Sequence, residues 1–282
     1  MTTYGVTGAT GHFGRNAINE LAKLVPATSI VALARNTEKA KQIVPSGVEV
    51  RPGDYTDVDQ LEKSLKGIDR LLFVSSQPGG SVDRLTQHEN VVKAAQKAEV
   101  GYIAYTSFPQ AEDSTAALAS DHQATEKLIL ETGIKHSFLR NNWYLENEAA
   151  SIKSAINNKP FIYAAGDGKV GWALESEYSE AAAKVLASND TKDVYEFAGP
   201  SRTYQDLATA IKSDFDVKSL SIEDYKDLLQ KSGMDEGTIG VVLAIQDLIR
   251  QGNLAEKSDD LQNVLGRELT PLDKALEIVG EK

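Results

Sequence analysis

Cysteine is absent from this chain of 282 residues, and its four histidines stand at positions 12, 88, 122 and 136. Without cysteine the chain has no disulfide, no thiol nucleophile and no cysteine-ligated metal site. The histidines form no HExxH pattern and no tight group with aspartate, so we expect no metal site. Catalysis by a thiol or a bound metal is therefore not expected.

Positive charge is also scarce, because 41 acidic side chains outnumber 30 basic ones and give a formal net charge of −11. A nucleic-acid-binding face needs clustered Lys and Arg, so we expect no nucleic-acid partner. No run of about 18 apolar residues is present, which argues against a membrane-spanning helix. The N-terminal residues Met1-Thr2-Thr3-Tyr4 lack the basic and apolar regions of a secretory signal, and we expect a cytoplasmic protein.

The first half of the chain alternates between the hydrophobic periods of buried strands and of helices. The expected strands are 3–7, 29–34, 48–51, 70–75, 101–106 and 136–140, and the expected helices are about 12–25, 36–44, 57–66, 82–98 and 115–132. Near-continuously apolar strands that alternate with helices indicate a parallel sheet covered on both faces. The predicted fold class is α/β, with a Rossmann-type doubly wound parallel sheet.

Beyond residue 150 the alternation is less regular, and turn residues such as Gly166-Asp167-Gly168 interrupt it. We expect a helix over 176–188, a strand over 194–198, a helix over 204–213 capped by Thr203, and mostly helical structure over 221–280. The predicted organisation is a Rossmann domain over residues 1–150, to which 171–198 returns. A smaller, mainly helical C-terminal substrate lobe comprises 151–170 and 199–282.

Gly8, Gly11 and Gly14 follow the first expected strand and open the first expected helix. Glycines at this spacing let the backbone turn tightly and approach a pyrophosphate, which then lies on the N–H groups of the helix N-terminus. The strand before and the helix after are the context that a dinucleotide site requires. We expect the site to comprise Gly8, Ala9, Thr10, Gly11, His12, Phe13 and Gly14; a purely structural glycine-rich turn is the alternative.

The residues after the second expected strand indicate which nicotinamide cofactor is used. Sites that prefer NAD place Asp or Glu there to bind the ribose 2′-hydroxyl, but this chain has Ala34-Arg35-Asn36. Arg35 can bind a 2′-phosphate through two hydrogen bonds, and Lys39, one helical turn further, supplies a second cation. The pattern favours NADPH; a solvated basic helix start is the alternative.

Further contacts follow from topology, because the ligand of a doubly wound sheet lies beyond the carboxyl ends of the strands. Small and polar residues follow several of these strands. Those expected to contact the cofactor are Ser75, Ser76, Gln77, Thr106, Ser107, Asn141, Asn142, Trp143 and Tyr144. Loops that are merely rich in hydrogen bonds are the alternative at each position.

A set of segments occurs in the order and spacing of a known family. They are TGATGHFG (7–14), ALARN (32–36), RPGDY (51–55), IAYTS (103–107), DHQATEKLI (121–129), LRNNWYLEN (139–147) and YAAGDGK (163–169). Together they resemble the NmrA-like atypical short-chain dehydrogenase/reductases, and most of all the NAD(P)H:quinone oxidoreductase type 2 group. The resemblance covers most of residues 1–200 and weakens in the tail. It implies a reductase that transfers hydride from NADPH to a small quinone, without flavin or metal; we include a homodimer among the expected assemblies.

The resemblance also implies roles for individual residues. Cofactor contacts are implied from Gly8 to Phe13, from Arg35, from Ser75 to Gln77, and from Asn141, Asn142, Trp143, Tyr144, Leu145 and Glu146. Asn147 is implied at the nicotinamide and quinone pocket, and Lys127 near the nicotinamide ribose. We take Asn147 and Lys127 as the catalytic residues.

One position departs from ordinary short-chain dehydrogenases, which place a tyrosine four residues before the lysine. Gln123 stands there and cannot donate a proton as a phenol does, although Ser107 is retained. Reducing a ketone forms a strongly basic alkoxide that needs an acid. Hydride addition to a quinone forms a weakly basic anion, which an amide such as that of Asn147 can stabilise. His122 is five positions from Lys127 and off its helix face, so we expect it to be a surface or capping residue.

Other functions are still open at this stage. NmrA-like folds can bind the dinucleotide without turnover, so an NADP-binding redox-sensing regulator is the alternative to the quinone reductase. A sugar-nucleotide epimerase or an isoflavone-type reductase is the third candidate, and the missing tyrosine counts against the epimerase. A quinone-dependent NADPH oxidation assay separates the enzyme from the sensor.

Overall fold

The computed structural model describes residues 1–281, so Lys282, the end of the predicted C-terminal lobe, lies outside it. The chain folds into two compact units. Unit 1 contains Met1–Asn141, Ser176–Phe197 and Asp260–Gly266, and unit 2 contains Asn142–Glu175, Ala198–Asp259 and the chain from Arg267 onward. None of the helices within residues 1–281 has the length and apolar composition needed to cross a membrane.

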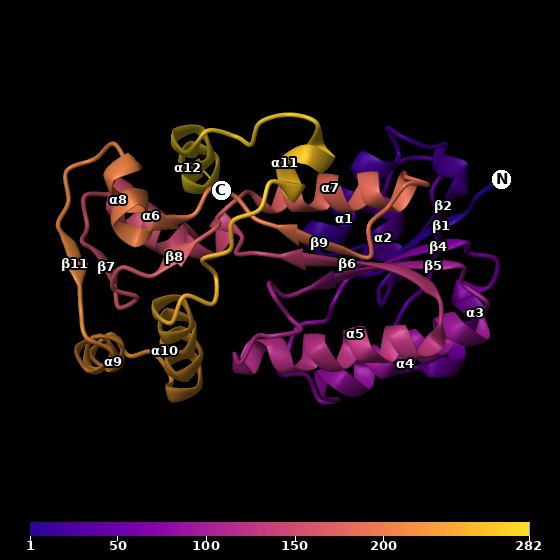
Figure 1. Ribbon diagram of the computed structural model, residues 1–282, viewed down its shortest axis with the longest axis horizontal. Helices are drawn as coiled ribbons and strands as arrows, with labels where there is room; N and C mark the ends of the chain where they lie inside the picture. The colour runs from indigo at the N-terminus through magenta and orange to yellow at the C-terminus, as the bar shows by residue number, and fades with distance from the viewer. Residues whose placement is uncertain (282) are drawn as a thin grey trace. The chain divides into compact units, whose positions relative to one another are not determined.

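Unit 1 is built on a seven-stranded sheet in the order β3-β2-β1-β4-β5-β6-β9, with neighbouring strands parallel. The strands are β1 (Tyr4–Val6), β2 (Ile30–Ala34), β3 (Glu49–Pro52), β4 (Arg70–Phe73), β5 (Tyr102–Ser107), β6 (Lys135–Asn141) and β9 (Val194–Phe197). The helices are α1 (His12–Leu21), α2 (Thr37–Ile43), α3 (Val58–Leu65), α4 (Arg84–Lys97), α5 (Ser120–Thr132), α7 (Glu175–Ala187) and α11 (Asp260–Leu265). Helices α3, α4 and α5 cover one face of the sheet, and α1 and α7 cover the other (Figure 1). The predicted α/β doubly wound fold is confirmed.

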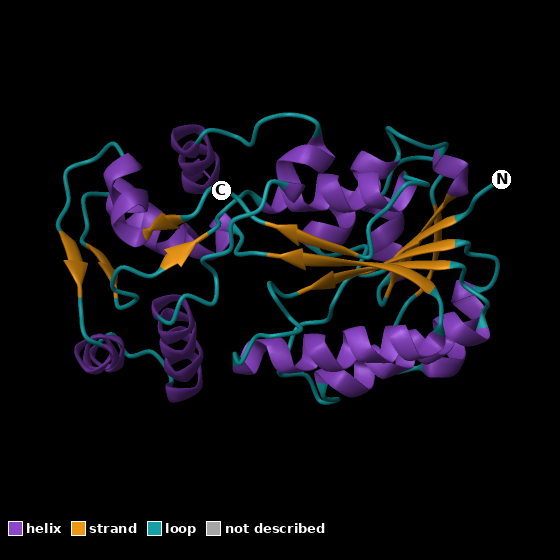
Figure 2. Cartoon of the chain, in the orientation of Figure 1, coloured by secondary structure: helices purple, strands orange, loops and turns teal. Residues whose placement is uncertain are grey.

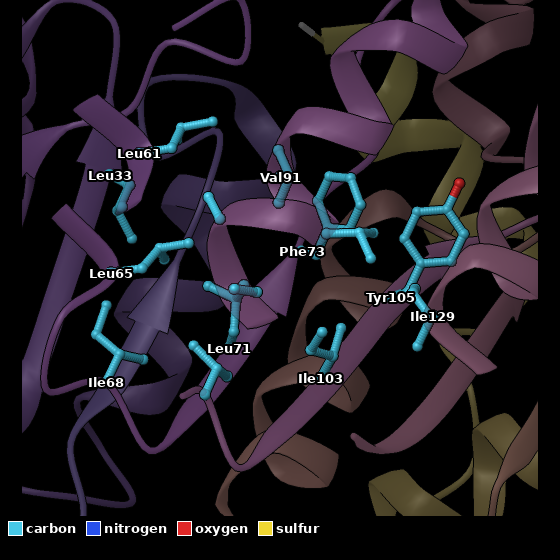
Figure 3. Packing of buried hydrophobic residues seen from close by; sticks show 14 of the residues in the cluster. Leu33, Leu61, Leu65, Ile68, Leu71, Phe73, Val91, Ile103, Tyr105 and Ile129 are labelled. Atoms are coloured by element: carbon cyan, nitrogen blue, oxygen red, sulfur yellow. The ribbon is translucent and has the colours of Figure 1, made fainter. Parts of the chain in front are cut away.

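The core between the sheet and helices α3, α4 and α5 is formed by apolar side chains from the strands and from these helices. Leu33, Leu71 and Phe73 of β2 and β4 are completely buried. Leu61 of α3 and Val91 of α4 belong to the same cluster (Figure 3). Burying one such side chain stabilises the fold by about 1.5–3 kcal/mol. The position of each apolar run therefore determines which segment enters the sheet.

Unit 2 combines helices with short strand pairs, and helix predominates, as predicted for the C-terminal lobe (Figure 2). Its helices are η3 (Leu145–Glu148), α6 (Ala149–Ile156), α8 (Tyr204–Ala210), α9 (Ile222–Lys231), α10 (Glu236–Arg250) and α12 (Leu272–Glu281). At its centre Tyr204 stacks on Tyr163 with ring centroids 5.1 Å apart, and Trp172 meets Tyr204 edge-on, also at 5.1 Å. Aromatic burial thus supplies much of the core of this unit.

Sequence periodicity does not predict the short strands of unit 2. β7 (Phe161–Tyr163) pairs in parallel with β11 (Val217–Ser219), and β8 (Lys169–Val170) pairs antiparallel with β10 (Arg202–Thr203). Strands of two or three residues show too little alternation to be recognised. The helix expected over 204–213 ends at Ala210, because Ile211 leaves the helical backbone region with ψ of 119°.

Candidate functional site

The loop between β1 and α1 has the geometry of a phosphate-binding turn. Gly8 adopts a left-handed backbone with φ of 63°, which glycine tolerates and other residues rarely adopt. A Cβ on Gly14 would collide with the carbonyl oxygen of Gly8 and lie 2.9 Å from that of Thr7, so only glycine lets α1 pack on the end of β1. Among the other predicted loop residues, Ala9 and Phe13 are buried, Thr10 is partly exposed, and Gly11 and His12 are exposed.

The N-terminus of α1 is open to an anion. Gly11 is its N-cap, and within residues 1–281 no side chain caps its first turn. Helices α2, α3 and α4, in contrast, are capped by the side chains of Asn36, Asp57 and Asp83. Uncapped N–H groups at the positive end of a helix dipole bind phosphate groups. The loop therefore fits the pyrophosphate of a dinucleotide.

Basic side chains follow β2, where a site for NAD would have a carboxylate. Arg35 and Lys39 are exposed, and neither forms an ion pair within the described part of the chain. Lys41 differs, because its Nζ lies 2.7 Å from Glu38 Oε1. The side chain of Asn36 accepts a hydrogen bond from the N–H of Lys39 at 2.9 Å and so fixes the start of α2. This arrangement suits a 2′-phosphate.

The loops beyond β3, β4 and β5 are joined by side-chain hydrogen bonds. The N–H of Ser75 donates to Thr106 Oγ1 at 2.8 Å, and these hydroxyls lie 3.2 Å apart. The hydroxyl of Tyr55 lies 2.5 Å from Thr7 Oγ1 and donates to the carbonyl of Val74 at 2.7 Å. The structure thus brings the predicted contacts Ser75 and Thr106 together.

Ser107, at the end of β5, takes part in a buried ion-pair network. Its Oγ donates to Glu126 Oε1 at 2.5 Å, and Arg140 binds the same carboxylate through Nε at 3.0 Å and Nη2 at 2.7 Å. Nη1 of Arg140 lies 3.0 Å from Glu196 Oε1. Burial lowers the pKa of Arg140, but its bonds to Glu126 and Glu196 prevail and raise it above its ordinary value. The proton of the Ser107 hydroxyl is therefore directed at Glu126.

The dehydrogenase triad keeps its serine and its lysine, and only the tyrosine position is altered. Gln123 donates from Nε2 to the carbonyl of Ser114 at 2.7 Å. The side chain of Lys127 is 78% exposed, and its Nζ lies 3.9 Å from Glu131 Oε1. Ordinary dehydrogenases have a phenol close to the serine and the lysine. Here an amide bound to a backbone carbonyl takes its place, so this position offers no proton donor of that kind.

The expectation that His122 is a surface or capping residue is wrong. His122 is only 6% exposed, and its Nδ1 lies 2.9 Å from the hydroxyl of Tyr105. Burial is the main cause that lowers its pKa well below the ordinary value, and the charge of Arg84 adds to it. The helix face opposite Lys127 packs against the sheet, which is why His122 is buried.

The run from Asn142 to Glu146 belongs to unit 2, whereas Asn141 ends β6 in unit 1. Asn142 holds this run in place: its Oδ1 accepts the N–H of Trp143 at 2.9 Å and that of Gly171 at 3.2 Å. Its Nδ2 donates to the carbonyl of Leu254 at 3.3 Å. In the remainder of the run, Trp143, Tyr144 and Glu146 are partly exposed and Leu145 is buried.

A buried carboxylate directly after Asn147 is a feature that the sequence reading missed. Glu148 is 8% exposed, and its Oε1 accepts hydrogen bonds from Trp143 Nε1 at 3.1 Å and from the hydroxyl of Tyr204 at 2.9 Å. Gln246 Nε2 donates to that hydroxyl at 3.1 Å. Burial raises the pKa of Glu148 to about 6, against the hydrogen bonds from Tyr204 and Trp143. Asn147 itself has an exposed side chain beside this network.

Comparison with known families shows to which family the chain belongs. The family model described as NAD(P)H-binding matches residues 8–169, which is more than half of the sequence. The chain belongs to this NAD(P)H-binding family. The matched range begins at Gly8 and includes Arg35 and the loops beyond β3, β4 and β5. The cofactor class predicted from the glycine loop is therefore confirmed.

Individual members of the family are similar along their whole length. Quinone oxidoreductase 2 of Escherichia coli (strain K12) is 39% identical over 279 residues, which cover 96% of each chain. A crystal structure of NADPH-dependent quinone oxidoreductase from Escherichia coli, complexed with NADPH, matches with a TM-score of 0.92 at 36% identity and covers 98% of this chain and 99% of that one. The triphenylmethane reductase of Citrobacter sp., complexed with NADP(H), has the same TM-score at 35% identity and the same coverage. The family resemblance inferred from the motifs is confirmed.

Proposed function

We propose that this protein is an NADPH-dependent reductase that transfers hydride to a small quinone without flavin or metal. The observation that carries the proposal is an intact cofactor loop combined with a triad that lacks its tyrosine. The loop between β1 and α1 offers an uncapped helix N-terminus, and Arg35 and Lys39, which follow β2, form no ion pair within residues 1–281. Gln123, in contrast, replaces the phenol that a ketone reductase needs. The quinone reductase and the triphenylmethane reductase among the relatives support the same assignment.

The residues of unit 1 fit the cofactor part by part. The N–H groups from His12 onward would hold the pyrophosphate, since the N–H of Gly11 donates to the carbonyl of Gly8 at 2.9 Å. Arg35 and Lys39 would hold the 2′-phosphate, and Ser75 to Gln77 with Thr106 the central part of the molecule. Lys127, on the exposed side of α5, is assigned to the nicotinamide ribose. When bound, NADPH supplies a hydride; the quinone gains two electrons and becomes a hydroquinone anion, which takes a proton from solvent.

Unit 2 is proposed as the acceptor lobe, with Asn147 as its principal polar contact. The exposed amide of Asn147 is suited to donate a hydrogen bond to the quinone oxygen, on which negative charge develops. A hydroquinone anion is much less basic than an alkoxide, so a neutral amide is a sufficient donor.

We also propose a cytoplasmic location and a homodimer. Size-exclusion chromatography with light scattering tests the homodimer.

The test is NADPH oxidation by the purified protein with small benzoquinones and naphthoquinones as acceptors. We expect quinone-dependent oxidation, and no reduction of NADP⁺ by simple secondary alcohols. The competing function is a redox sensor that binds the dinucleotide without turnover. A folded preparation that binds NADPH but oxidises none of it with any quinone would favour the sensor.

A further inference from the structure

Buried polar side chains from α4, β5 and α5 form a hydrogen-bonded chain beside the core of unit 1. His88, Tyr105 and Thr125 are each 0% exposed, and His122 is 6% exposed. Nδ1 of His88 lies 2.8 Å from Thr125 Oγ1 and 3.4 Å from the hydroxyl of Tyr105, which also bonds His122. In Figure 3 the hydroxyl of Tyr105 points away from the aliphatic side chains of the core. Burying polar groups is costly unless they are hydrogen-bonded, and a fully bonded network makes its surroundings rigid.

The direction of these hydrogen bonds determines the tautomer of His88. Its Nε2 lies 3.0 Å from the backbone nitrogen of Ser76, and a backbone N–H can only donate. Nε2 is therefore the acceptor, and the proton of the neutral ring is on Nδ1, from which it is donated to Thr125 Oγ1. The hydroxyl of Thr125 donates in turn to the carbonyl of Asp121 at 2.6 Å. Each proton along this path has an acceptor.

Two side chains of helix α4 form hydrogen bonds with the backbone N–H and the backbone carbonyl of Ser76. The N–H of Ser76 is bound by His88, and its carbonyl accepts a hydrogen bond from Arg84 Nε at 2.7 Å. The Oγ of Ser76 is buried and has no hydrogen-bond partner within residues 1–281. The position of Ser76 therefore depends on these backbone bonds. Burial and the charge of Arg84 lower the pKa of His88 to about 3, so its ring stays a neutral acceptor near neutral pH.

We propose that His88 is a positioning residue for NADPH, which holds the loop from Ser75 to Gln77 in its binding conformation through the N–H of Ser76. The inference rests on the proposed function, in which this loop contacts the cofactor. His88 touches no ligand itself, since it is completely buried. Its contribution is preorganisation: a loop that is already ordered loses less entropy when the cofactor binds.

Paired amide substitutions separate the two ends of the His88 ring. In His88→Gln the amide oxygen reaches the position of Nε2 and can accept the Ser76 N–H. In His88→Asn the shorter amide reaches only the position of Nδ1 and keeps the bond to Thr125. We expect His88→Asn to weaken NADPH binding about tenfold, as the loss of a buried hydrogen bond implies, and His88→Gln to weaken it less than about threefold.

Binding is measured by NADPH fluorescence without quinone, so the result does not depend on turnover. The melting temperature of each variant without NADPH is recorded as well. His136→Gln is the control, because His136 is partly buried on β6 but is not part of the hydrogen-bonded group of His88, Tyr105, Thr125 and His122. If the Asn and Gln variants bind NADPH equally well, or if affinity follows melting temperature alone, the proposal is overturned. Failure of the wild type to bind NADPH would contradict the proposed function instead.

A measurement on the wild type needs no substitution. Nitrogen NMR of the histidine rings reports which ring nitrogen carries the proton. We expect His88 to be neutral and protonated on Nδ1 at about pH 6 to 8, and its signals to shift when NADPH is added. A proton on Nε2 would remove the acceptor for Ser76 and contradict the proposal.

Discussion

At the scale of single residues, cofactor choice depends on Arg35. Charge-assisted hydrogen bonds contribute roughly 1.5–3 kcal/mol each, so Arg35→Ala should weaken NADPH about 10- to 150-fold. NADH has no 2′-phosphate and should bind nearly as before. Lys41→Ala is the matched control, because Lys41 is already paired with Glu38. Dissociation constants for both cofactors test this, and an equal loss for NADPH and NADH would show that Arg35 does not bind the 2′-phosphate.

Asn147 should act mainly on the reaction and less on binding. An amide that donates to developing charge lowers the barrier more than it stabilises the bound quinone. Asn147→Ala should therefore lower kcat more than it raises KM. The expected loss of kcat is smaller than the ~10²-fold loss seen when an oxyanion donor is removed. Asn157→Ala, an exposed asparagine just beyond α6, is the control. A rise in KM with kcat unchanged would reduce Asn147 to a binding residue.

At the scale of elements, Glu148 joins η3 to α8 through Tyr204 and should make the stability of the protein depend on pH. Burial raises the pKa of Glu148 from an ordinary 4.5 to about 6. The folded state thus binds the proton of Glu148 more tightly than the unfolded state does. The contribution of the protonated acid to the free energy of unfolding is therefore fully present below about pH 4 and is lost as the pH rises through 6. The loss amounts to about 2 kcal/mol.

Glu148→Gln removes this dependence. Trp143 and Tyr204 both donate to Oε1, which the amide oxygen of Gln can replace. Urea unfolding should show the variant gaining about 2 kcal/mol relative to the wild type between about pH 4 and pH 7. Glu131→Gln, on the exposed end of α5, should show no such gain. A difference that does not change with pH would mean that Glu148 is ionised equally in the folded and unfolded chain.

The elements also show where sequence reasoning succeeds and fails. The central strands β1, β2, β4 and β5 are almost completely buried, and burial of this kind leaves an apolar run in the sequence. The pairs β7–β11 and β8–β10 depend on partners distant in the chain, and their two or three residues carry no pattern. Glu148 and His88 were missed for a related reason. Nothing local distinguishes a buried polar residue from an exposed one when its partners come from other elements.

At the scale of the whole molecule, the glycine loop, Arg35 and the ordered motifs indicate the fold and the cofactor class. Both predictions are confirmed by the sheet order and by the family match to residues 8–169. The roles of Asn147 and Lys127 stay predictions, because they depend on where an acceptor binds. Sequence motifs describe this loop well since its backbone geometry requires glycine, whereas an acceptor pocket is formed by scattered side chains with no fixed spacing.

The central claim is that this protein reduces quinones with NADPH, and steady-state turnover tests it most directly. Purified protein with no added flavin or metal is mixed with NADPH and a series of small benzoquinones and naphthoquinones, and loss of NADPH absorbance is followed. Thermal stabilisation by NADPH shows beforehand that the cofactor binds. The account predicts saturable, quinone-dependent oxidation that is faster with NADPH than with NADH and is reduced in Arg35→Ala. Stabilisation by NADPH without turnover of any quinone would contradict it.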